Sequence, residues 1–568
     1  MEPEGGSERI AWKEWSKETF DIAAKEGKLI LLDLTASWCH WCHVMDRTTY
    51  SDPEIVRTIN ATFVPIRVDI DKRPDISERY NRGGFPTTAF LSDQGESIWG
   101  ATYVPVSDMK RIINSIIDAN RSGEIGQALE RSRMHFLDIS AAMEPKAPLS
   151  PSETEDVFED IFATYDVENG GFGLAPKFPH PAVLEMLMAK YSTDDDKELA
   201  DAVVNTLRRM SEGLYDRVEG GLFRYSVSGD WRLPHYEKML DTNLGYLGNL
   251  VHAHAIFGDE DFEAWAQGTA EYLLRTLRDK RSGGFFGSQD ADEEYYRLDG
   301  AEREKRKAPG IDRTAYAGWN SEAVSVLVNS GMLLRDDKIV RAGEQAWRFI
   351  VDRLWEKDRG LVRHCDSQDL FLFEDQVALL FAALGMLDIS EDDEPMRLAE
   401  SLIKGVDAAF AHEDGGYGDV EKVKGAVGEL DSQRRSLAEN AAWARGLALF
   451  GAVTHQDALV EKARSTLMSF TKKDVDSSGL FAAAYVIARW TLERGPVTVE
   501  VHSDDPEGPP AARLAGVARK CLDPAVVVRG LKDPEAEVPY AVICSSAGCL
   551  SRIEDPDKLA EALRSRGS

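Results

Sequence analysis

The sequence predicts a multidomain protein of α/β and all-α class. We expect a small N-terminal α/β domain, a central ring of six helical hairpins (an (α/α)6 toroid) and a small C-terminal α/β appendage. A Cys-x-x-Cys pair follows an apolar run near the N-terminus, glycine phrases recur between long amphipathic stretches, and short apolar runs return at the end. We place the domains at 1–125, 151–494 and 495–568, with a linker over 126–150.

The composition is that of a globular protein and argues against several function classes. A chain of 568 residues is too long for a single hydrophobic core, and 43% of its residues are hydrophobic. Its net charge is -31 and it has no basic stripe, so we expect no nucleic-acid binding. The polar N-terminus and the absence of a long apolar run predict neither a signal peptide nor a membrane span. Six cysteines do not make a disulfide framework here. We therefore expect a cytoplasmic protein without membrane association.

The first domain is expected to alternate strands and helices. Leu29–Leu34 is an apolar run typical of a buried strand, and a helix is expected to begin near Cys39. The later elements are a β-branched strand over 61–71, a strand entered through Pro86, a strand over 97–105 and an amphipathic helix over 106–120. This order predicts a compact α/β domain.

The position of Cys39 at a helix N-terminus has a chemical consequence. The unpaired amides and the helix dipole there favour an anion, so we expect a lowered thiol pKa and an available thiolate. Cys42 lies one turn further on and is placed to resolve a mixed disulfide.

These residues resemble thioredoxin. The phrase "LLDLTASWCHWC" matches that family's pattern of a strand, an acid and Trp-Cys-x-x-Cys, with Asp33 six residues before Cys39, and "GGFPTTAFL" resembles its Gly-x-Pro-Thr strand entry. The resemblance implies that Pro86 is a cis-proline facing the dithiol and that Asp33 moves a proton to or from Cys42.

His40 and Trp41 replace the Gly-Pro of thioredoxin between the cysteines. A histidine beside the nucleophile can stabilise its thiolate, so we expect a more oxidising disulfide than that of thioredoxin. Four potential zinc ligands on one helical turn cannot all face a tetrahedral ion, and we predict no metal or cofactor. A metal shared through Cys39 and Cys42, or a pair of inert buried thiols, remains an alternative.

The middle of the chain carries a repeated signal. Glycine phrases such as "NGGFG" and "GGFFG" occur at Gly170, Gly220, Gly283, Gly360, Gly415 and Gly479. The gaps of 50, 63, 77, 55 and 64 residues each suit a pair of helices with its connections. We call these six glycine phrases the glycine stations. Six stations predict six helical hairpins closed into a ring, with the glycine turns folding over one end.

Polar side chains among aromatic residues are expected at the mouth of this ring. They occur in "RLPHYEKMLDTN", "GSQDADEEYY", "YAGWNSEA", "LFEDQVAL" and "LAENAAWA", at comparable offsets from the stations. Aromatic faces and carboxylates suit a sugar-binding groove, and paired carboxylates suit glycoside hydrolysis. The alternative is that these residues are helix caps and buried polar ties.

The whole chain resembles the spermatogenesis-associated protein 20 family, a thioredoxin-like domain fused to a six-hairpin glycosidase-like toroid. The likeness rests on "CHWCHVM", "RPDI", "APKFP", "PHYEKML", "DAD", "WN" and "FEDQ". Carried over by position, it implies a toroid pocket that includes His235, Glu237, Lys238, Asp290, Asp292, Trp319, Asn320, Glu374, Asp375 and Asn440. The phrase "AENAAWA" departs from the family's Ser-Gly-Asn-Ser, keeping Asn440 and adding Glu439. The "GGFPTTAF" phrase also departs, toward thioredoxin itself.

The tail is expected to be a small α/β domain with strands over 495–505, 525–531 and 540–550. Cys544 and Cys549 either form a second thiol pair or are two unconnected thiols near a turn. Cys365 and Cys521 have no partner in the sequence and are expected to be structural.

Three functions compete. The first is a thiol–disulfide oxidoreductase that acts on protein or small-molecule thiols and disulfides through Cys39, Cys42 and Asp33, while the toroid binds an unknown ligand. The second is a carbohydrate-active epimerase or hydrolase in the toroid, with a regulatory thioredoxin-like domain. The third is a non-catalytic, redox-sensing binding protein, whose ligand affinity would change when the dithiol oxidises.

Overall fold

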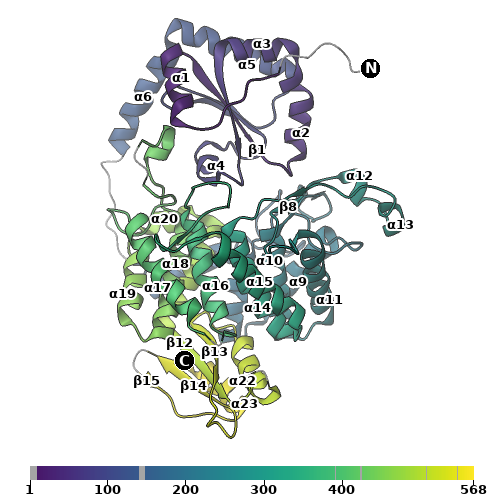
Figure 1. The fold of residues 1–568 in the computed structure, drawn as a ribbon, viewed down its shortest axis with the longest axis vertical. Coiled ribbons are helices and arrows are strands. Elements are labelled where there is room, and N and C mark those ends of the chain that lie inside the picture. The colour runs from purple at the N-terminus through teal and green to yellow at the C-terminus, as the bar shows by residue number, and fades with distance from the viewer. Residues whose placement is uncertain are drawn as a thin grey trace. The chain divides into compact units, whose positions relative to one another are not determined.

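The computed structural model describes residues 9–139, 148–390, 392–422, 425–506, 508–545 and 548–567 (Figure 1). The chain divides into two compact units. The first comprises 1–145 together with 422–434, and the second comprises 146–421 and 435–568.

The first unit is built on a four-stranded sheet of order β2-β1-β3-β4. Strands β1 and β2 are parallel, and β3 runs antiparallel to β1 and to β4. Its strands are β1 (Leu29–Thr35), β2 (Phe63–Asp69), β3 (Thr87–Leu91) and β4 (Ser97–Ala101). Its helices are α1 (Lys17–Glu26), α2 (His40–Arg47), α3 (Pro53–Thr62), α4 (Pro74–Tyr80), α5 (Val106–Ser122) and α6 (Glu124–Ile139).

The predicted strands of this unit are present, but four of its helices were not predicted. Helices α1 and α3 begin at well-formed caps, where the side chains of Ser16 and Asp52 accept hydrogen bonds from first-turn amides. Helix α4 begins at a proline in its first turn. Helix α6 covers residues that the sequence analysis assigned in part to a linker.

A distant segment completes the first unit. Within residues 425–434, the backbone carbonyls of Glu429 and Ser432 accept hydrogen bonds from Arg79, at 2.9 and 2.7 Å. The Glu429 amide donates to the hydroxyl of Tyr80 at 2.9 Å. The side chain of Arg79 is buried by these contacts, so a segment 350 residues away along the chain is part of this unit.

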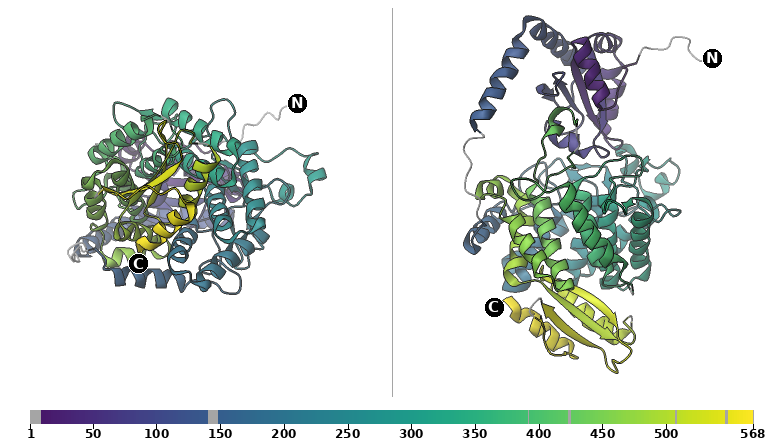
Figure 2. Two further views of the ribbon diagram at one scale, coloured as in Figure 1. Left: turned by 90° about the horizontal axis from the view of Figure 1, so that it is seen from below. Right: turned by 60° about the vertical axis from the view of Figure 1, so that its left-hand side comes forward.

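The second unit contains the predicted ring of six hairpins. Each inner helix lies beside the next, in the order α8, α10, α14, α16, α18, α21 and back to α8, which closes the ring (Figure 2, left). The inner helices are α8 (Pro181–Asp194), α10 (Leu240–Phe257), α14 (Ala317–Leu334), α16 (Phe373–Met386), α18 (Leu437–Thr454) and α21 (Ala483–Arg494). The outer helices are α7 (Pro151–Phe162), α9 (Lys197–Leu214), α11 (Glu260–Tyr272), α15 (Asp337–Arg353), α17 (Glu394–Ala409) and α19 (Asp457–Leu467).

Each glycine station lies between an outer helix and the inner helix that follows it. Gly170, Gly220, Gly283 and Gly415 all have positive φ, between 69° and 87°, a conformation that favours glycine. At Gly220 an added Cβ would lie 2.3 Å from the carbonyl oxygen of Gly268, so the turn also needs the missing side chain. The stations therefore mark the end of the ring at which the inner helices begin.

Short helices and strands lie at that end of the ring. The helices are α12 (Glu293–Tyr296), α13 (Gly300–Arg303) and α20 (Lys472–Ser477). The strands are β5 (Tyr225–Ser226), β6 (Pro234–His235), β7 (Lys238–Met239), β8 (Ser288–Gln289), β9 (Ile311–Asp312), β10 (Trp355–Glu356) and β11 (Leu361–Val362). Strands β7, β8 and β9 form one small sheet.

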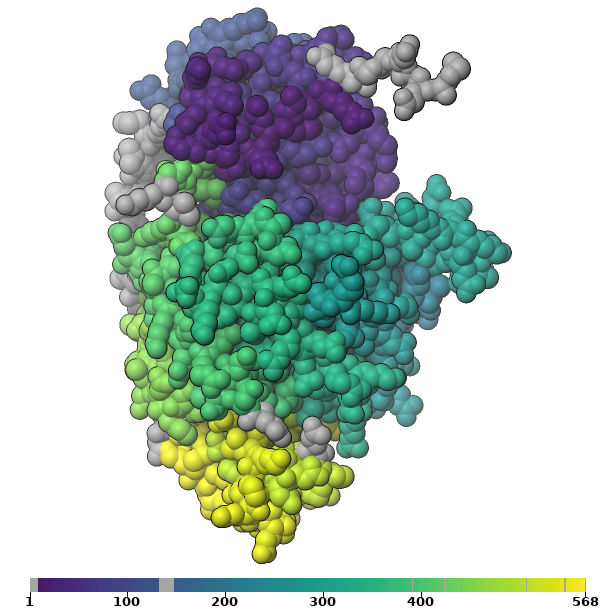
Figure 3. Space-filling model, viewed as in Figure 1, coloured from purple at the N-terminus to yellow at the C-terminus, as the bar shows by residue number. Residues whose placement is uncertain are grey.

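The C-terminal α/β domain belongs to the second unit and packs directly against the ring (Figure 3). Its sheet has the order β13-β12-β14-β15, with a core shared by the sheet and the two helices. Its elements are β12 (Val497–Ser503), α22 (Pro509–Lys520), β13 (Val526–Lys532), β14 (Tyr540–Ser545), β15 (Gly548–Cys549) and α23 (Pro556–Arg564). Cys544 and Cys549 face each other across β14 and β15 and form a disulfide.

Among the helices of the described residues, none combines the length and the apolar character that crossing a membrane requires.

Candidate functional site

The dithiol lies where strand β1 leads into helix α2. Cys39 is the residue that caps α2, and its sulfur accepts a hydrogen bond from the amide of Cys42 at 3.2 Å. The two sulfurs form a disulfide, and each cysteine is only 3% exposed. Once the disulfide is reduced, the same amide and the helix dipole stabilise a thiolate at Cys39.

Asp33 is buried in β1 and forms part of a charged network. Its carboxylate accepts a hydrogen bond from Arg67 Nε at 2.7 Å, and the Arg67 Nη2 atom reaches Asp46 on α2 at 2.5 Å. Burial raises the pKa of Asp33 to about 6; the nearby charge of Asp46 adds to the rise, and Arg67 opposes it. Asp33 can therefore exchange a proton close to neutral pH.

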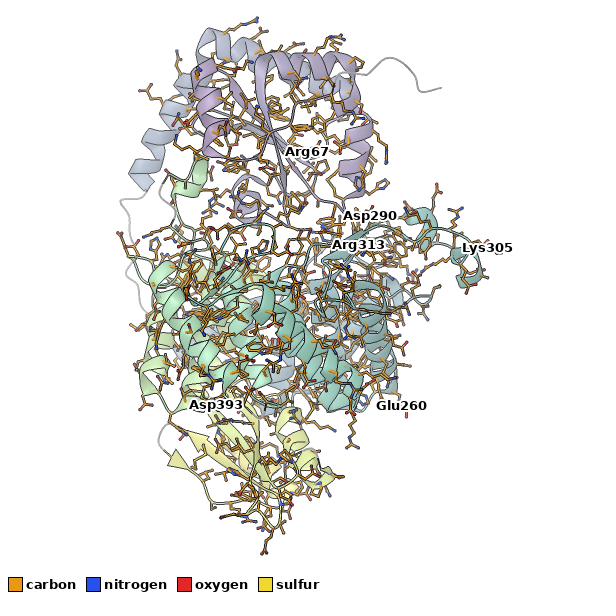
Figure 4. All side chains as sticks on the ribbon, viewed as in Figure 1. Arg67, Glu260, Asp290, Lys305, Arg313 and Asp393 are labelled. Atoms are coloured by element: carbon orange, nitrogen blue, oxygen red, sulfur yellow. A yellow bond between two sulfur atoms is a disulfide. The ribbon has the colours of Figure 1, made fainter. Side chains whose placement is uncertain are left out.

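Arg67 ties the active-site helix to the sheet. It lies opposite Asp33 in the parallel β1–β2 pair, and its guanidinium lies 4.3 Å from the ring centroid of Trp12 (Figure 4). Arg67 was not among the predicted site residues. The available signal was a single arginine within the apolar run "FVPIRVD", since a cation in such a strand needs a buried partner.

Aromatic residues surround the dithiol. The peptide bond between Phe85 and Pro86 is cis, as the thioredoxin resemblance implied. The buried Trp38 donates a hydrogen bond to Asp71 at 2.6 Å, and its ring lies 6.3 Å from that of Phe85. Trp41 is 46% exposed, and His40 is also exposed, so the two inserted residues lie on the surface beside the disulfide.

We expect Asp33→Asn to change how dithiol exchange depends on pH. We expect an ionised Asp33 to accept the proton of the resolving thiol, so the wild-type rate should fall as the pH drops below about 6. The variant should lose that step and be about 10-fold slower at pH 7. Stopped-flow rates of disulfide exchange between pH 5 and 8 measure both effects. Asp21→Asn, which changes an exposed carboxylate of the same unit, should match the wild type, and an unchanged profile in Asp33→Asn would exclude this role.

The mouth of the ring brings several predicted residues together. His235 Nδ1 lies 3.2 Å from Glu237 Oε1, and the His235 ring stacks on Tyr225, which stacks on Phe178, with centroid distances of 4.5 and 4.6 Å. Glu237 is 2% exposed, and its Oε2 atom is buried without a hydrogen-bond partner among the described residues.

The small sheet at the mouth places two acids opposite each other. Lys238 pairs with Gln289 in the antiparallel β7–β8 ladder, so Glu237 and Asp290 occupy facing positions just beyond it. Figure 4 labels Asp290 at this end of the ring. Trp319 lies nearby in the first turn of α14, with its ring 4.9 Å from that of Tyr316.

Two further carboxylates lie on neighbouring inner helices, within phrases predicted for the mouth but not among the named pocket residues. Asp241 is in the first turn of α10 and Glu322 in the second turn of α14. Burial, followed by the charge of Asp241, raises the pKa of Glu322 to about 8, and burial also raises the pKa of Asp241. Glu322 was the sole charge in the apolar run "AGWNSEAVSVLV", which could have marked it.

A histidine–carboxylate pair adds to the mouth. His364 Nδ1 lies 2.9 Å from Asp375 Oδ2, and the other oxygen of Asp375 accepts from the amide of Gly318 at 2.7 Å. Potential ligand atoms of His364, Glu374 and Asp375 lie within 4.8 Å of one another, a spacing that a metal ion could use. Both oxygens of Asp375 already accept hydrogen bonds, so the group fits an oriented histidine better than a metal centre.

Four predicted pocket residues have structural roles instead. The side-chain amides of Asn320 and Asn440 are fully buried and hold the glycine-containing loops in place. Asn320 accepts a hydrogen bond from the backbone amide of Phe285 at 2.7 Å and donates one to the Phe285 carbonyl. Asn440 makes the same two bonds with Tyr417, also accepting at 2.7 Å. Asn243 and Gln376 do the same in two other hairpins. Both N–H groups of each amide donate to backbone carbonyls, so these amides have no donor left for a ligand.

Lys238 and Asp292 complete this group. Lys238 is fully buried and donates to Asp216 at 2.6 Å and to the carbonyl of Gly220 at 2.8 Å. Lys177 repeats the arrangement one hairpin earlier, with Asp166 and the carbonyl of Gly170. Asp292 is exposed and caps α12 by accepting from the amide of Tyr295. For these four residues the alternative of caps and buried ties holds.

Comparison with known proteins supports the description of the N-terminal domain. Residues 4–134 match the family Thioredox_DsbH, described as "Protein of unknown function, DUF255". Thioredoxin-1 of Drosophila melanogaster is 37% identical over 70 residues, covering 12% of this chain and 63% of that protein. The N-terminal domain is thus thioredoxin-like, with its Cys-x-x-Cys at Cys39 and Cys42.

Longer similarities extend into the ring. Spermatogenesis-associated protein 20 of Rattus norvegicus is 32% identical over 307 residues, 50% of this chain and 39% of that protein. The human protein of the same name is 30% identical over 348 residues, 57% of this chain and 43% of that protein. The resemblance to this family is confirmed, and the matched region spans less than half the length of these relatives.

Solved structures similar to the ring include a cellobiose 2-epimerase from Bacillus thermoamylovorans B4167. It is 11% identical, covers 56% of this chain and 85% of its own, and has a TM-score of 0.46. This likeness is too low to assign a function.

Proposed function

We propose that the N-terminal unit is a thiol–disulfide oxidoreductase that acts on protein or small-molecule disulfides. The observation that carries the proposal is the pairing of Cys39, at the cap of α2 with an amide directed at its sulfur, with Cys42 one turn away. An inert structural disulfide needs no such cap and no buried acid of raised pKa in the strand that leads into it.

The reaction follows from these positions. The Cys39 thiolate attacks one sulfur of the substrate disulfide and releases the other as a thiolate, which leaves a mixed disulfide. Asp33 accepts the proton of the Cys42 thiol, and the resulting thiolate attacks Cys39 and releases the second substrate thiol. The enzyme is left with the Cys39–Cys42 disulfide, which an external dithiol must reduce before the next turnover. The cytoplasm, where dithiol donors are abundant, is the compartment that we predict for this cycle.

The reduction potential of the dithiol tests the proposal. His40 lies beside Cys39 and can stabilise the thiolate. We therefore expect a reduction potential above the value of about -270 mV that is typical of thioredoxin. Equilibration of the full chain with glutathione buffers measures it, and His40→Ala should lower the potential. A value at or below that of thioredoxin would contradict the role given to His40. A disulfide that no dithiol buffer can reduce would contradict the proposed function.

We also propose that the mouth of the ring binds a carbohydrate-like ligand and performs acid–base chemistry on it. The supporting observation is the pair Asp241 and Glu322: burial raises the pKa of both, and the pKa of Glu322, about 8, keeps that acid protonated near neutral pH. The stacked rings of Phe178, Tyr225 and His235 offer an apolar face of the kind that sugar rings contact. A screen of mono- and oligosaccharides, with Asp290→Asn as the binding control, tests this; no binding by any sugar would count against it.

The raised pKa of Glu322 predicts a measurable effect on stability. Its pKa is about 8 in the folded chain and about 4.3 when unfolded, so the folded state holds a proton that the unfolded state has lost. The free energy of unfolding should therefore fall as the pH rises from about 5 to 8, and Glu322→Gln should remove this fall. Urea unfolding at pH 5, 7 and 9 measures it. Glu260→Gln, at an exposed position of α11, is the control, and a Glu322→Gln profile parallel to the wild type would contradict the prediction (Figure 4).

A further inference from the structure

A second cavity lies in the other half of the ring, away from the glycine stations. It has a volume of about 230 Å³ and is lined by residues of the inner helices α8, α10, α14 and α18, by Asp388 just after α16, and by α22, the loop 522–524 and β13. All of these elements belong to the second unit. None of the residues assigned above to the mouth lines it.

Two arginines in this cavity are each paired with a carboxylate. Arg445 Nη1 donates to Glu185 Oε1 at 2.7 Å, and Arg519 donates through Nε and Nη2 to Asp388 Oδ2 at 2.9 and 2.7 Å. Burial lowers the pKa of His252, so that ring is neutral at pH 7. Asp523, the third carboxylate of the lining, pairs with Arg494 and Arg566 at 3.4 and 3.6 Å. Each charged side chain of the lining therefore already has a partner of opposite charge, and a ligand with a net charge would be buried without a free counter-charge.

Hydrogen-bonding capacity nevertheless remains. Asp388 Oδ1 is buried with no hydrogen-bond partner among the described residues, and the Glu185 side chain keeps 40% of its surface accessible inside the ring. His252 Nε2 and Asn329 Nδ2 lie 2.8 Å apart at the same wall. A buried carboxylate oxygen without a donor is costly, and a ligand hydroxyl would relieve that cost.

The remaining lining identifies the size and class of ligand. Met188, Ala189, Val526 and Val528 supply an apolar wall, and no Phe, Tyr or Trp is available among the lining residues to stack a nucleobase. A cavity of about 150 Å³ holds a benzene ring, so this one holds a molecule with a single six-membered ring. Hydroxyl groups can donate to carboxylates and accept from guanidinium and amide groups at the same time.

We propose that this cavity binds a neutral polyhydroxylated molecule the size of one six-membered ring. The site is separate from the mouth, and the proposal does not depend on either function proposed above. Carboxylate acceptors, guanidinium donors and an apolar wall together suit such a molecule, whereas phosphorylated, carboxylated and aromatic ligands fit poorly.

Calorimetric titration of the full chain with myo-inositol, D-glucose and glycerol tests the proposal. We expect at least one of them to bind, D-glucose 6-phosphate not to bind, and hydrogen exchange to slow over residues 522–528 on binding. Ala189→Leu fills the cavity without removing a charge and should weaken binding at least about 10-fold. Asn329→Leu, which removes a polar contact, is the second variant should the first fail to fold, as circular dichroism would reveal.

The mouth supplies the matched control. Glu322→Gln alters the mouth alone and should leave polyol binding at this cavity unchanged. Binding that is lost in Glu322→Gln but kept in Ala189→Leu or Asn329→Leu would overturn the proposal, because the ligand would then occupy the mouth. No heat of binding from any of the three polyols would also overturn it and would identify the cavity as a water-filled seam beneath the C-terminal domain.

Discussion

Cys39→Ser should abolish dithiol exchange, with the rate falling at least about 100-fold, because the thiolate is the nucleophile and no other group can replace it. The cap of α2 gives this sulfur an amide donor that a serine hydroxyl cannot use to form a comparable nucleophile. Reduction of insulin disulfides by the full chain, with dithiothreitol as the donor, measures the effect.

The matched control for this experiment is Cys521→Ser. Burial raises the pKa of the Cys521 thiol to about 11, so this cysteine is a poor nucleophile, and its removal should leave the rate unchanged. Wild-type activity in Cys39→Ser would refute the proposed function. Loss of activity in both variants would show that the assay reports damage to the fold and not the chemistry of one thiol.

Lys238→Ala should destabilise the second unit by about 3–5 kcal/mol, because it breaks a buried ion pair. Burial lowers the pKa of Lys238 to about 8, and Asp216 opposes that shift, so the ammonium is charged at pH 7. Without the Lys238 ammonium, Asp216 keeps only Arg303 as a cationic partner, and the carbonyl of Gly220 loses a hydrogen-bond donor. Urea unfolding followed by circular dichroism measures the change.

Two variants check the interpretation of Lys238. Arg232→Ala removes an exposed cation from the loop before β6 and should change the free energy of unfolding by less than about 0.5 kcal/mol. Lys177→Ala should resemble Lys238→Ala, since Lys177 makes the same two kinds of contact one hairpin earlier. A Lys238→Ala variant as stable as the wild type would return Lys238 to the set of candidate ligand-binding residues.

Features that depend on neighbours in the chain were predictable. Cys39, Cys42 and Asp33 lie within ten residues, and the strand–helix turn between them follows from local pattern. The six stations were predictable because each needs glycine for a backbone conformation that few other residues adopt. The ring followed from their spacing alone.

Features that depend on pairing between distant segments were not predictable. Arg67 faces Asp33 only because of the register of β1 and β2, and Arg79 is buried by a segment 350 residues further on. Asn320 and Asn440 were expected to face a ligand, because a sequence does not reveal whether an amide points into a mouth or into a station loop. Glu322 lies in a phrase predicted for the mouth but was not named as a pocket residue, since its significance comes from burial and from the charge of Asp241.

Trapping of a mixed disulfide in Cys42→Ser tests the central claim most directly. This variant keeps the nucleophile but lacks the resolving thiol, so reaction with oxidised glutathione should stop at a glutathione adduct. Peptide mass spectrometry of the full chain is expected to find that adduct on Cys39. An unmodified Cys39, with glutathione found only on Cys365, Cys521 or no cysteine at all, would contradict the assignment of this dithiol as a redox centre.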